Sequence, residues 1–360
     1  MPTQDLFDKP FDDATIAKLE IFEKYVEVWL PVFIHGKFES ANICDFFAGA
    51  GKDERGTLGS PLRILKVIEL FKDQIISNRF QINVLFNDFD SEKLETLKRL
   101  IAQNQKSMGG LEEFVKIHFF NEDFKNLFKN LKGNLRKKNN LFFLDQNGVK
   151  QILRDVIYEL EEFTRTDFMF FISSAFFHRF PFEKCFPDLE LDVGDMKQND
   201  IHREILKYYR GMLPDDSETR LYPYSLKKKR NIHGLIFGSK SLLGVEKFLD
   251  ISWKENTTNG EANFDIDNEN PNQMLLPGCE KIKKLDKFKA DLEEFGRQKK
   301  EFTNRDVLEY TLDGGFPTWA ARKYMIGMKK EKLVEHFSHA KIGYKQVFKD
   351  NDIITFRFKT

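Results

Sequence analysis

The stretch "ICDFFAGAGKDERG", from Ile43 to Gly56, decides the fold of the first part of the chain. An apolar run ends at Asp45 and leads into a loop that carries Gly49 and Gly51. Glycine lets a ligand approach the backbone closely, and in open α/β sheets ligands lie beyond the carboxyl ends of the strands. The stretch therefore indicates a ligand-binding loop behind a buried strand.

Two common phosphate-binding loops do not match this stretch. A dinucleotide fingerprint needs a third glycine three residues after Gly51, but that position is Glu54. A Walker A loop needs Gly-Lys-Ser/Thr, and here Asp53 follows the lysine. The remaining pattern is D-x-F-x-G-x-G, formed by Asp45, Phe47, Gly49 and Gly51.

Apolar runs and amphipathic segments alternate around the loop. Buried strands are predicted at 42–47, 82–88, 114–120, 140–145, 167–173 and 233–239. Helices are predicted at 14–33, after Ser60, after Ser91 and from Val149. This alternation predicts an α/β fold: a mostly parallel, Rossmann-like sheet with helices on both faces.

Acids stand at the ends of the next two predicted strands. Asp88 ends the second strand, where a carboxylate can accept both ribose hydroxyls of an adenosine, and Asp123 follows the third. Together with the glycine pattern, these acids resemble the motifs of class I S-adenosylmethionine (SAM) methyltransferases. The resemblance implies SAM as cofactor, with the glycines along its methionine part and Asp123 at the adenine amine. Taken singly, a glycine pair also serves as a bare turn and an acid as a helix cap.

Nearly the whole chain also resembles the three-Cys-motif partner (TcmP) family. The resemblance rests on "DFFAGAG...GSPLRIL", "LFFLDQNGVKQI" and "GLIFGSKSLLGVEKFLDISWK...NGEANFD". It implies a methyltransferase-like protein whose genomic neighbour is a cysteine-rich, radical-SAM-like protein, and whose substrate is unassigned.

The part of the site that would hold the methyl acceptor, here called the acceptor side, depends on "FLDQNG", residues 143–148. Nucleic-acid amino-methyltransferases carry an Asp/Asn-Pro-Pro-aromatic box at this place, whose acid or amide holds the amine and whose ring stacks on a flipped base. Asp145 keeps the acid and Asn147 lies beside it, but the prolines and the ring are missing. Asp145 and Asn147 are the candidate catalytic residues, with helix capping as the structural alternative for Asp145.

Composition excludes several other classes of protein. Lys+Arg and Asp+Glu both number 57, so any nucleic-acid contact has to be local. Three cysteines without a C-x-x-C pair, and no third ligand near the histidines, argue against a metal site or a disulfide scaffold. Without an apolar membrane-spanning stretch, the protein is expected to be soluble and cytoplasmic.

The pattern divides the chain into parts. Residues 1–255 are predicted to form the Rossmann-like domain, with an insertion at about 180–231; 256–283 form a linker, and 284–360 a winged-helix-like domain. The second helix of that last domain carries the candidate nucleic-acid contacts Arg322, Lys323, Lys329 and Lys330.

Two functions remain open at this point. One is a SAM-dependent methyltransferase that acts on DNA or RNA. The other is a SAM-binding or catalytically silent partner subunit of a multi-protein system, such as an anti-phage system. The glycines and Asp88 favour the first, and the incomplete acceptor box favours the second.

Overall fold

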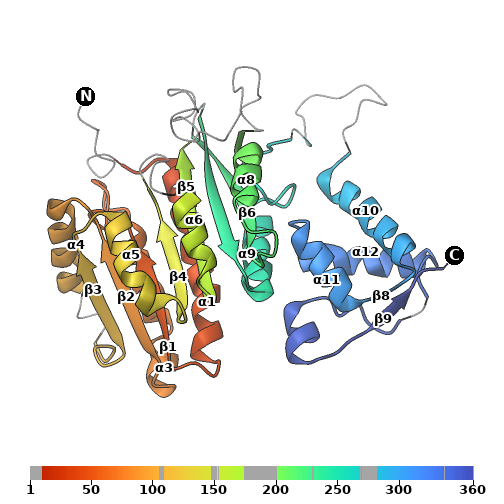
Figure 1. The fold of residues 1–360 in the computed structure, drawn as a ribbon, viewed down its shortest axis with the longest axis horizontal. Helices are drawn as coiled ribbons and strands as arrows, with labels where there is room; N and C mark the ends of the chain where they lie inside the picture. The colour runs from red at the N-terminus through yellow and green to blue at the C-terminus, as the bar shows by residue number, and fades with distance from the viewer. Residues whose placement is uncertain are drawn as a thin grey trace. The chain divides into compact units, whose positions relative to one another are not determined.

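The computed structural model describes residues 10–104, 109–146, 152, 154–173, 201–228, 231–267, 269, 282–335 and 337–359. The chain divides into two units, Met1–Lys240 and Ser241–Thr360 (Figure 1). The division lies ahead of the boundary predicted at residue 255, because the helix at 242–255 packs with the C-terminal helices. Each unit is described by itself.

The first unit is built on a seven-stranded mixed sheet with the strand order β3-β2-β1-β4-β5-β7-β6. The pairs among β1 to β5 are parallel, whereas β7 runs antiparallel to both β5 and β6. The strands are β1 (Ser40–Asp45), β2 (Gln81–Asn87), β3 (Val115–Phe120), β4 (Asn139–Leu144), β5 (Arg165–Ser173), β6 (Arg220–Lys228) and β7 (Asn231–Ser239). The mostly parallel Rossmann-like sheet predicted from the sequence is therefore confirmed.

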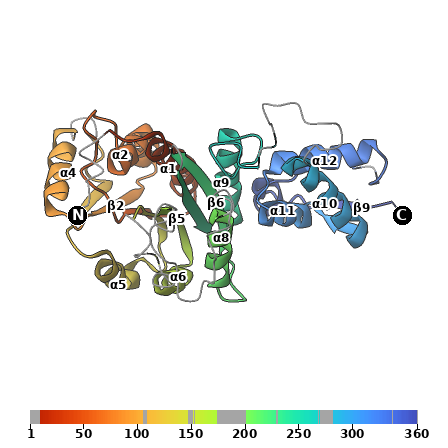
Figure 2. The same cartoon turned by 90° about the horizontal axis from the view of Figure 1, so that it is seen from above.

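Helices cover both faces of this sheet. They are α1 (Asp13–Ile34), α2 (Ser60–Leu70), α3 (Lys72–Ser77), α4 (Ser91–Asn104), α5 (Phe124–Leu135), α6 (Arg154–Glu161) and α8 (Ile201–Gly211). α1, α2 and α4 lie on one face, while α5, α6 and α8 lie on the other and share one apolar cluster (Figure 2). Because side chains alternate along a strand, Phe142 enters that cluster and Phe143 packs under α1.

The N-terminal helix α1 runs antiparallel to β4, as its contacts show. The Phe22 ring stacks on Phe143 with centroids 4.0 Å apart. One turn earlier Lys18 pairs with Asp145, just past the end of β4. One turn later the Tyr25 hydroxyl donates to the buried carboxylate of Asp167 over 2.7 Å. These contacts, at helical i, i+4 and i+3 spacing, fix α1 along the strand.

A chain of side-chain amides, buried at Asn42 and Asn140 and half-buried at Asn83, links the strands near their amino ends. The amide of Asn83 donates to the side chain of Asn42 over 3.0 Å, and that of Asn42 donates to Asn140 over 2.8 Å. The amide of Asn140 in turn donates to the Thr166 hydroxyl over 2.8 Å. Each link joins residues that face each other in the parallel register, so the chain fixes that register across β2, β1, β4 and β5.

The sequence prediction of an insertion at about 180–231 is corrected in its last part. Residues 220–228 form β6, which pairs with β7 along its length. Pro223 lies within this strand, and proline is tolerated there because β6 is the edge of the sheet. Residues 201–211 form α8, while residues 180–200 lie outside the described part of the chain.

The second unit contains α9 (Leu242–Glu255), α10 (Lys284–Lys299), α11 (Asn304–Asp313), α12 (Thr318–Lys330) and a two-stranded antiparallel sheet of β8 (Glu301–Thr303) and β9 (Thr355–Arg357). A capping box between Thr303 and Asp306 starts α11. Phe288 and Phe316 stack at 4.0 Å in the core of this unit.

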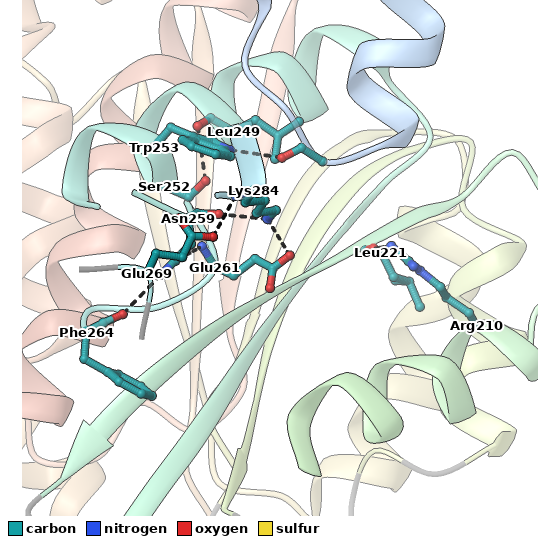
Figure 3. A network of polar contacts seen from close by, with 11 residues as sticks. Arg210, Leu221, Leu249, Ser252, Trp253, Asn259, Glu261, Phe264, Glu269 and Lys284 are labelled. Atoms are coloured by element: carbon teal, nitrogen blue, oxygen red, sulfur yellow. Dashed lines mark hydrogen bonds and ion pairs between the residues drawn. The ribbon is translucent and has the colours of Figure 1, made fainter. Parts of the chain in front are cut away.

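The described part of the predicted linker is folded onto the second unit (Figure 3). Lys284, at the start of α10, donates through Nζ to the carbonyl of Asn259 over 2.8 Å and pairs with Glu261. Its backbone N–H donates to Glu269 over 2.8 Å. Nζ also lies 5.3 Å from the ring of the buried Trp253. Residues 256–267 are thus held by side-chain bonds and do not form a free linker.

Among the described residues, no helix is both long enough and apolar enough to cross a membrane.

Candidate functional site

The loop after β1 and the acid after β2 are joined by a hydrogen bond. Gly49 and Gly51 both have positive φ, +63° and +86°, where a side chain would be strained. The N–H of Gly49 donates to Oδ2 of Asp88 over 2.8 Å. The N–H of Ala48 donates to the carbonyl of Asn87 over 2.8 Å. The glycines and Asp88 therefore lie together at the carboxyl edge of the sheet, as the sequence predicted.

Gly51 is also required by packing. A Cβ at this position would lie 2.7 Å from Cδ1 of Leu97 on α4, and Leu97 is fully buried. The carbonyl of Gly51 accepts the N–H of Gly59 over 2.8 Å, which closes the loop. Gly51 therefore has a structural reason to be glycine, independent of any ligand.

Asn87 holds the loops after β1, β2 and β3 together. It is buried, and its amide donates to the carbonyls of Phe46 and Glu122, each over 3.1 Å. Its side-chain oxygen accepts the N–H of Glu122 over 3.1 Å. The sequence analysis missed this residue, although a polar residue directly before the strand-end acid was a usable signal.

Phe89 is a second residue that the sequence analysis missed. Its side chain is 79% exposed, although it directly follows Asp88. The side-chain amide of Asn121 donates to the carbonyls of Asp88 and Phe89 over 2.8 and 3.0 Å, which fixes this turn. A large aromatic ring is therefore held in solvent beside the strand-end acid.

Asp123 serves as the N-cap of α5. Its Oδ1 accepts the N–H groups of Lys125 and Asn126 over 3.0 and 3.2 Å. These bonds satisfy two backbone donors at the start of the helix. This is the structural alternative that the sequence left open for Asp123.

Asp45 ends β1 and is completely buried. Its Oδ1 accepts the N–H of Phe47 over 3.2 Å, whereas Oδ2 has no hydrogen-bond partner among the residues that the structure describes. Burial raises the pKa of this carboxyl to about 7; the Ser60 hydroxyl and the Phe47 amide oppose the increase, and the charges of Asp145 and Asp88 add to it. Asp45, Asp88 and Asp145 thus form one cluster of acids at the ends of β1, β2 and β4.

Asp145 is paired with a cation that the sequence analysis did not identify. Lys18 of α1, 5% exposed, donates through Nζ to Oδ2 of Asp145. The same Nζ lies 4.3 Å from the ring centre of Phe171 on β5, which places an aromatic ring at the acceptor side from another strand. The other candidate, Asn147, lies outside the described residues. The described part of the chain contains no group of three or more His, Cys, Asp or Glu that could hold a metal ion.

Two of the four predicted nucleic-acid contacts are used inside the second unit. Nε of Arg322 donates to the carbonyl of Ile342 over 2.9 Å, and Nη2 donates to the Thr318 hydroxyl over 3.0 Å. Nζ of Lys329 donates to the carbonyl of Phe337. These side chains therefore stabilise the unit.

The other two cations, Lys323 and Lys330, are exposed on α12. Acids lie near the same helix: the charge of Arg322 acts on the carboxyls of Glu246 and Asp250 on α9, whose pKa values are raised mainly by burial. The net positive charge around α12 is consequently smaller than the four basic residues of the helix suggested.

Comparisons with known proteins give structural likeness only. No model of a known protein family matches the chain, and no curated protein matches it. Among solved structures, it is similar to a DszA carbon methyltransferase, with 12% identity and a TM-score of 0.37, over 63% of this chain and 55% of that one. It is also similar to the METTL16 methyltransferase domain, with 12% identity and a TM-score of 0.31, over 60% and 66% of the two chains.

A SAM-dependent methyltransferase from Aquifex aeolicus is a further neighbour, with 10% identity and a TM-score of 0.26, over 63% of this chain and 99% of that one. These three neighbours are described as methyltransferases. At these identities and TM-scores the likeness assigns neither an activity nor a substrate.

Proposed function

We propose that the first unit binds SAM at the carboxyl edge of its sheet and is a methyltransferase-like protein. The observation that carries the proposal is the bond from the Gly49 N–H to Asp88, which unites the glycine loop and the strand-end acid in one site. Within the described part of the chain Oδ2 of Asp45 is buried and has no hydrogen-bond partner, which fits a site that receives a ligand with positive charge, as SAM has.

The neighbouring residues suggest how the cofactor is held. Asp88 accepts the ribose hydroxyls, and the loop at Gly49 lies along the methionine part. The exposed ring of Phe89 offers a face for the adenine. When bound, SAM supplies a methyl group on a positively charged sulfur. The resemblance also assigns Asp123 to the adenine amine, although its carboxylate already caps α5.

Titration calorimetry with SAM and its demethylated product, S-adenosylhomocysteine (SAH), tests this proposal. Asp88→Asn keeps the size and one acceptor oxygen, so it can keep the bond from the Gly49 N–H but loses the one from the Asp90 N–H. It should weaken SAM binding about ten- to a hundred-fold. Glu92→Gln, in the first turn of α4, is the matched control and should bind as the wild type does. If the wild-type protein releases no heat and shows no thermal shift with millimolar SAM, the proposal is wrong.

The acceptor side supports methyl transfer less strongly. Asp145 is engaged by Lys18, and the sequence beside it lacks the proline and aromatic residues of an amino-methyltransferase. This observation favours the second candidate, a SAM-binding but catalytically silent partner subunit. On the TcmP resemblance, its partner would be a three-Cys-motif, radical-SAM-like protein encoded nearby, and an anti-phage system is one setting in which the two would act together.

Transfer of a labelled methyl group separates the two candidates. The protein is incubated with methyl-labelled SAM and either DNA or RNA, alone and with the neighbouring gene product. Label on nucleic acid that disappears in Asp145→Asn supports an enzyme. SAM binding without label under every condition supports the silent subunit.

For the second unit, we propose a winged-helix-like module that contacts nucleic-acid phosphate through the exposed Lys323 and Lys330. Replacing both by Ala should lower the dependence of log affinity on log salt by about 0.9 per lost contact. Arg322 and Lys329 are excluded from this test because their loss would disturb folding. Equal affinities of wild type and variant for DNA and RNA across a salt titration would favour a protein partner instead.

A further inference from the structure

Lys18 brings a positive charge into the candidate cofactor site from outside the sheet. Its carrier, α1, is fixed by the Phe22–Phe143 stack and by the bond from Tyr25 to Asp167, so its position along β4 is determined. The ammonium group is buried, forms an ion pair with Asp145 and lies over the ring of Phe171. Packing and charge therefore both hold it at this edge.

The charges that Lys18 meets belong to one cluster. Asp45 and Asp145 end neighbouring strands, since Asp45 faces Phe143 in the register of β1 and β4. The charges of Asp145 and Asp88 both act on the carboxyl of Asp45. One oxygen of Asp45 is buried without a hydrogen-bond partner among the described residues. Three carboxyl groups, of which Asp45 is buried and Asp88 and Asp145 are half-buried, thus act on one another at this edge, and Lys18 is in direct contact with Asp145.

We propose that Lys18 is a specificity-determining residue that sets how strongly this site prefers the sulfonium cofactor over its neutral thioether product. The inference rests on the proposed function. SAM and SAH differ in a methyl group and one positive charge at sulfur. The carboxyl cluster attracts that charge, while Lys18 offsets the attraction and so permits the product to bind and to compete. Removing the ammonium should therefore favour SAM relative to SAH.

The measured quantity is the ratio of the two dissociation constants, Kd(SAH)/Kd(SAM), by calorimetry on the full chain at about pH 8.5. Lys18→Met should raise this ratio about 3- to 10-fold, because a unit charge in a partly buried site acts on a charged ligand and not on a neutral one. Asp145→Asn should lower it by a similar factor. The double variant should return to the wild-type ratio, because it removes one charge of each sign.

Loss of a buried ion-pair partner is destabilising, so the design includes a second comparison. If Lys18→Met does not fold, comparison of Asp145→Asn with the double variant isolates the same lysine charge, and the double variant should have the higher ratio. Lys132→Met, which removes a half-buried lysine paired with Glu162 on the far side of the sheet, is the control and should leave the ratio unchanged.

The outcomes separate the two levels of the proposal. If the wild-type protein binds neither ligand, the proposed function and this inference are both overturned. The inference alone is overturned if the wild-type protein binds both ligands but the lysine does not affect the ratio. In that case the ratio of Lys18→Met stays within twofold of wild type, or that of the double variant stays within twofold of Asp145→Asn. A rise on loss of the lysine, from wild type to Lys18→Met or from Asp145→Asn to the double variant, with no change in Lys132→Met, supports it.

Discussion

Asp88 is bonded at both carboxylate oxygens to the backbone of its own surroundings: Oδ2 accepts the N–H of Gly49 and Oδ1 accepts the N–H of Asp90, over 2.8 and 2.9 Å. One side chain thus orders the loop after β1 and the turn after β2. Asp88 therefore positions the glycine loop, and the ribose contact that we propose for it would come in addition to that structural role.

The capping role of Asp123 gives the first prediction. Asp123→Ala should lower the free energy of unfolding by about 1 kcal/mol, because two N–H groups at the start of α5 lose their acceptor. Urea unfolding measures this. Asp123→Ser keeps a capping oxygen and should recover most of the loss. We expect both variants to bind SAM within about twofold of wild type; a tenfold loss in the Ser variant would assign Asp123 to the adenine.

Two glycines with nearly the same φ give the second prediction. Gly51→Ala should destabilise by about 2–4 kcal/mol, since it combines backbone strain at φ +86° with a clash against the buried Leu97. Gly56→Ala is the matched control: its φ is +83°, but a Cβ there meets nothing within 4 Å. It should cost about 1 kcal/mol. Equal denaturation midpoints for the two variants would contradict the packing role of Gly51.

The buried carboxyl of Asp45 predicts a dependence of stability on pH. Its pKa is about 7 in the folded protein against 3.8 for the free group, so between about pH 4 and 7 the folded state holds a proton that the unfolded state has lost. Stability should therefore fall as pH rises through this range, by at most about 4 kcal/mol from this group. Asp167, whose pKa is raised by burial to about 6, acts in the same direction.

Asp45→Asn removes the Asp45 contribution and is compared with wild type by urea unfolding at pH 5 and pH 8. The variant should lose less stability between the two pH values. Equal losses would show that Asp45 is not protonated in the folded protein at pH 5.

The buried amide chain gives the fourth prediction. Asn140→Ala leaves the side-chain amide of Asn42 without its acceptor and creates a cavity, so the free energy of unfolding should fall by about 2–4 kcal/mol. Asn78→Ala, at the exposed end of α3, is the control and should change it by less than about 1 kcal/mol. A tolerated Asn140→Ala would mean that the strand register is fixed by apolar packing alone.

The strands that the sequence predicted are those with a continuous apolar run. The prediction at 82–88, for example, corresponds to β2 at Gln81–Asn87. β6 was missed because Pro223 and the basic residues at its end are typical of a loop, and only its position at the sheet edge makes them compatible with a strand. Such a position depends on pairing with β7, which local sequence does not encode.

The site was predictable where it depends on chain order and was not where it depends on packing between distant segments. Gly49 and Asp88 follow consecutive strands, so their proximity follows from a parallel sheet. Lys18 lies 127 residues before Asp145, and its place at the site follows from the packing of α1 on β4. Its signal in the sequence was a lysine on the apolar face of a helix, which by itself is compatible with a side chain that reaches solvent.

The residues of α1 have partners far along the chain, and this distance in sequence has a consequence for the synthesis of the protein. The partners of Lys18 and Tyr25 lie 127 and 142 residues later, so the helix leaves the ribosome well before β4 and β5 exist. Until then Phe22 lacks its stacking partner Phe143, and this part of the apolar face of α1 is available to chaperones or to other nascent chains. Closing such long loops is slow, and docking of α1 is expected to be a late event in the folding of the first unit.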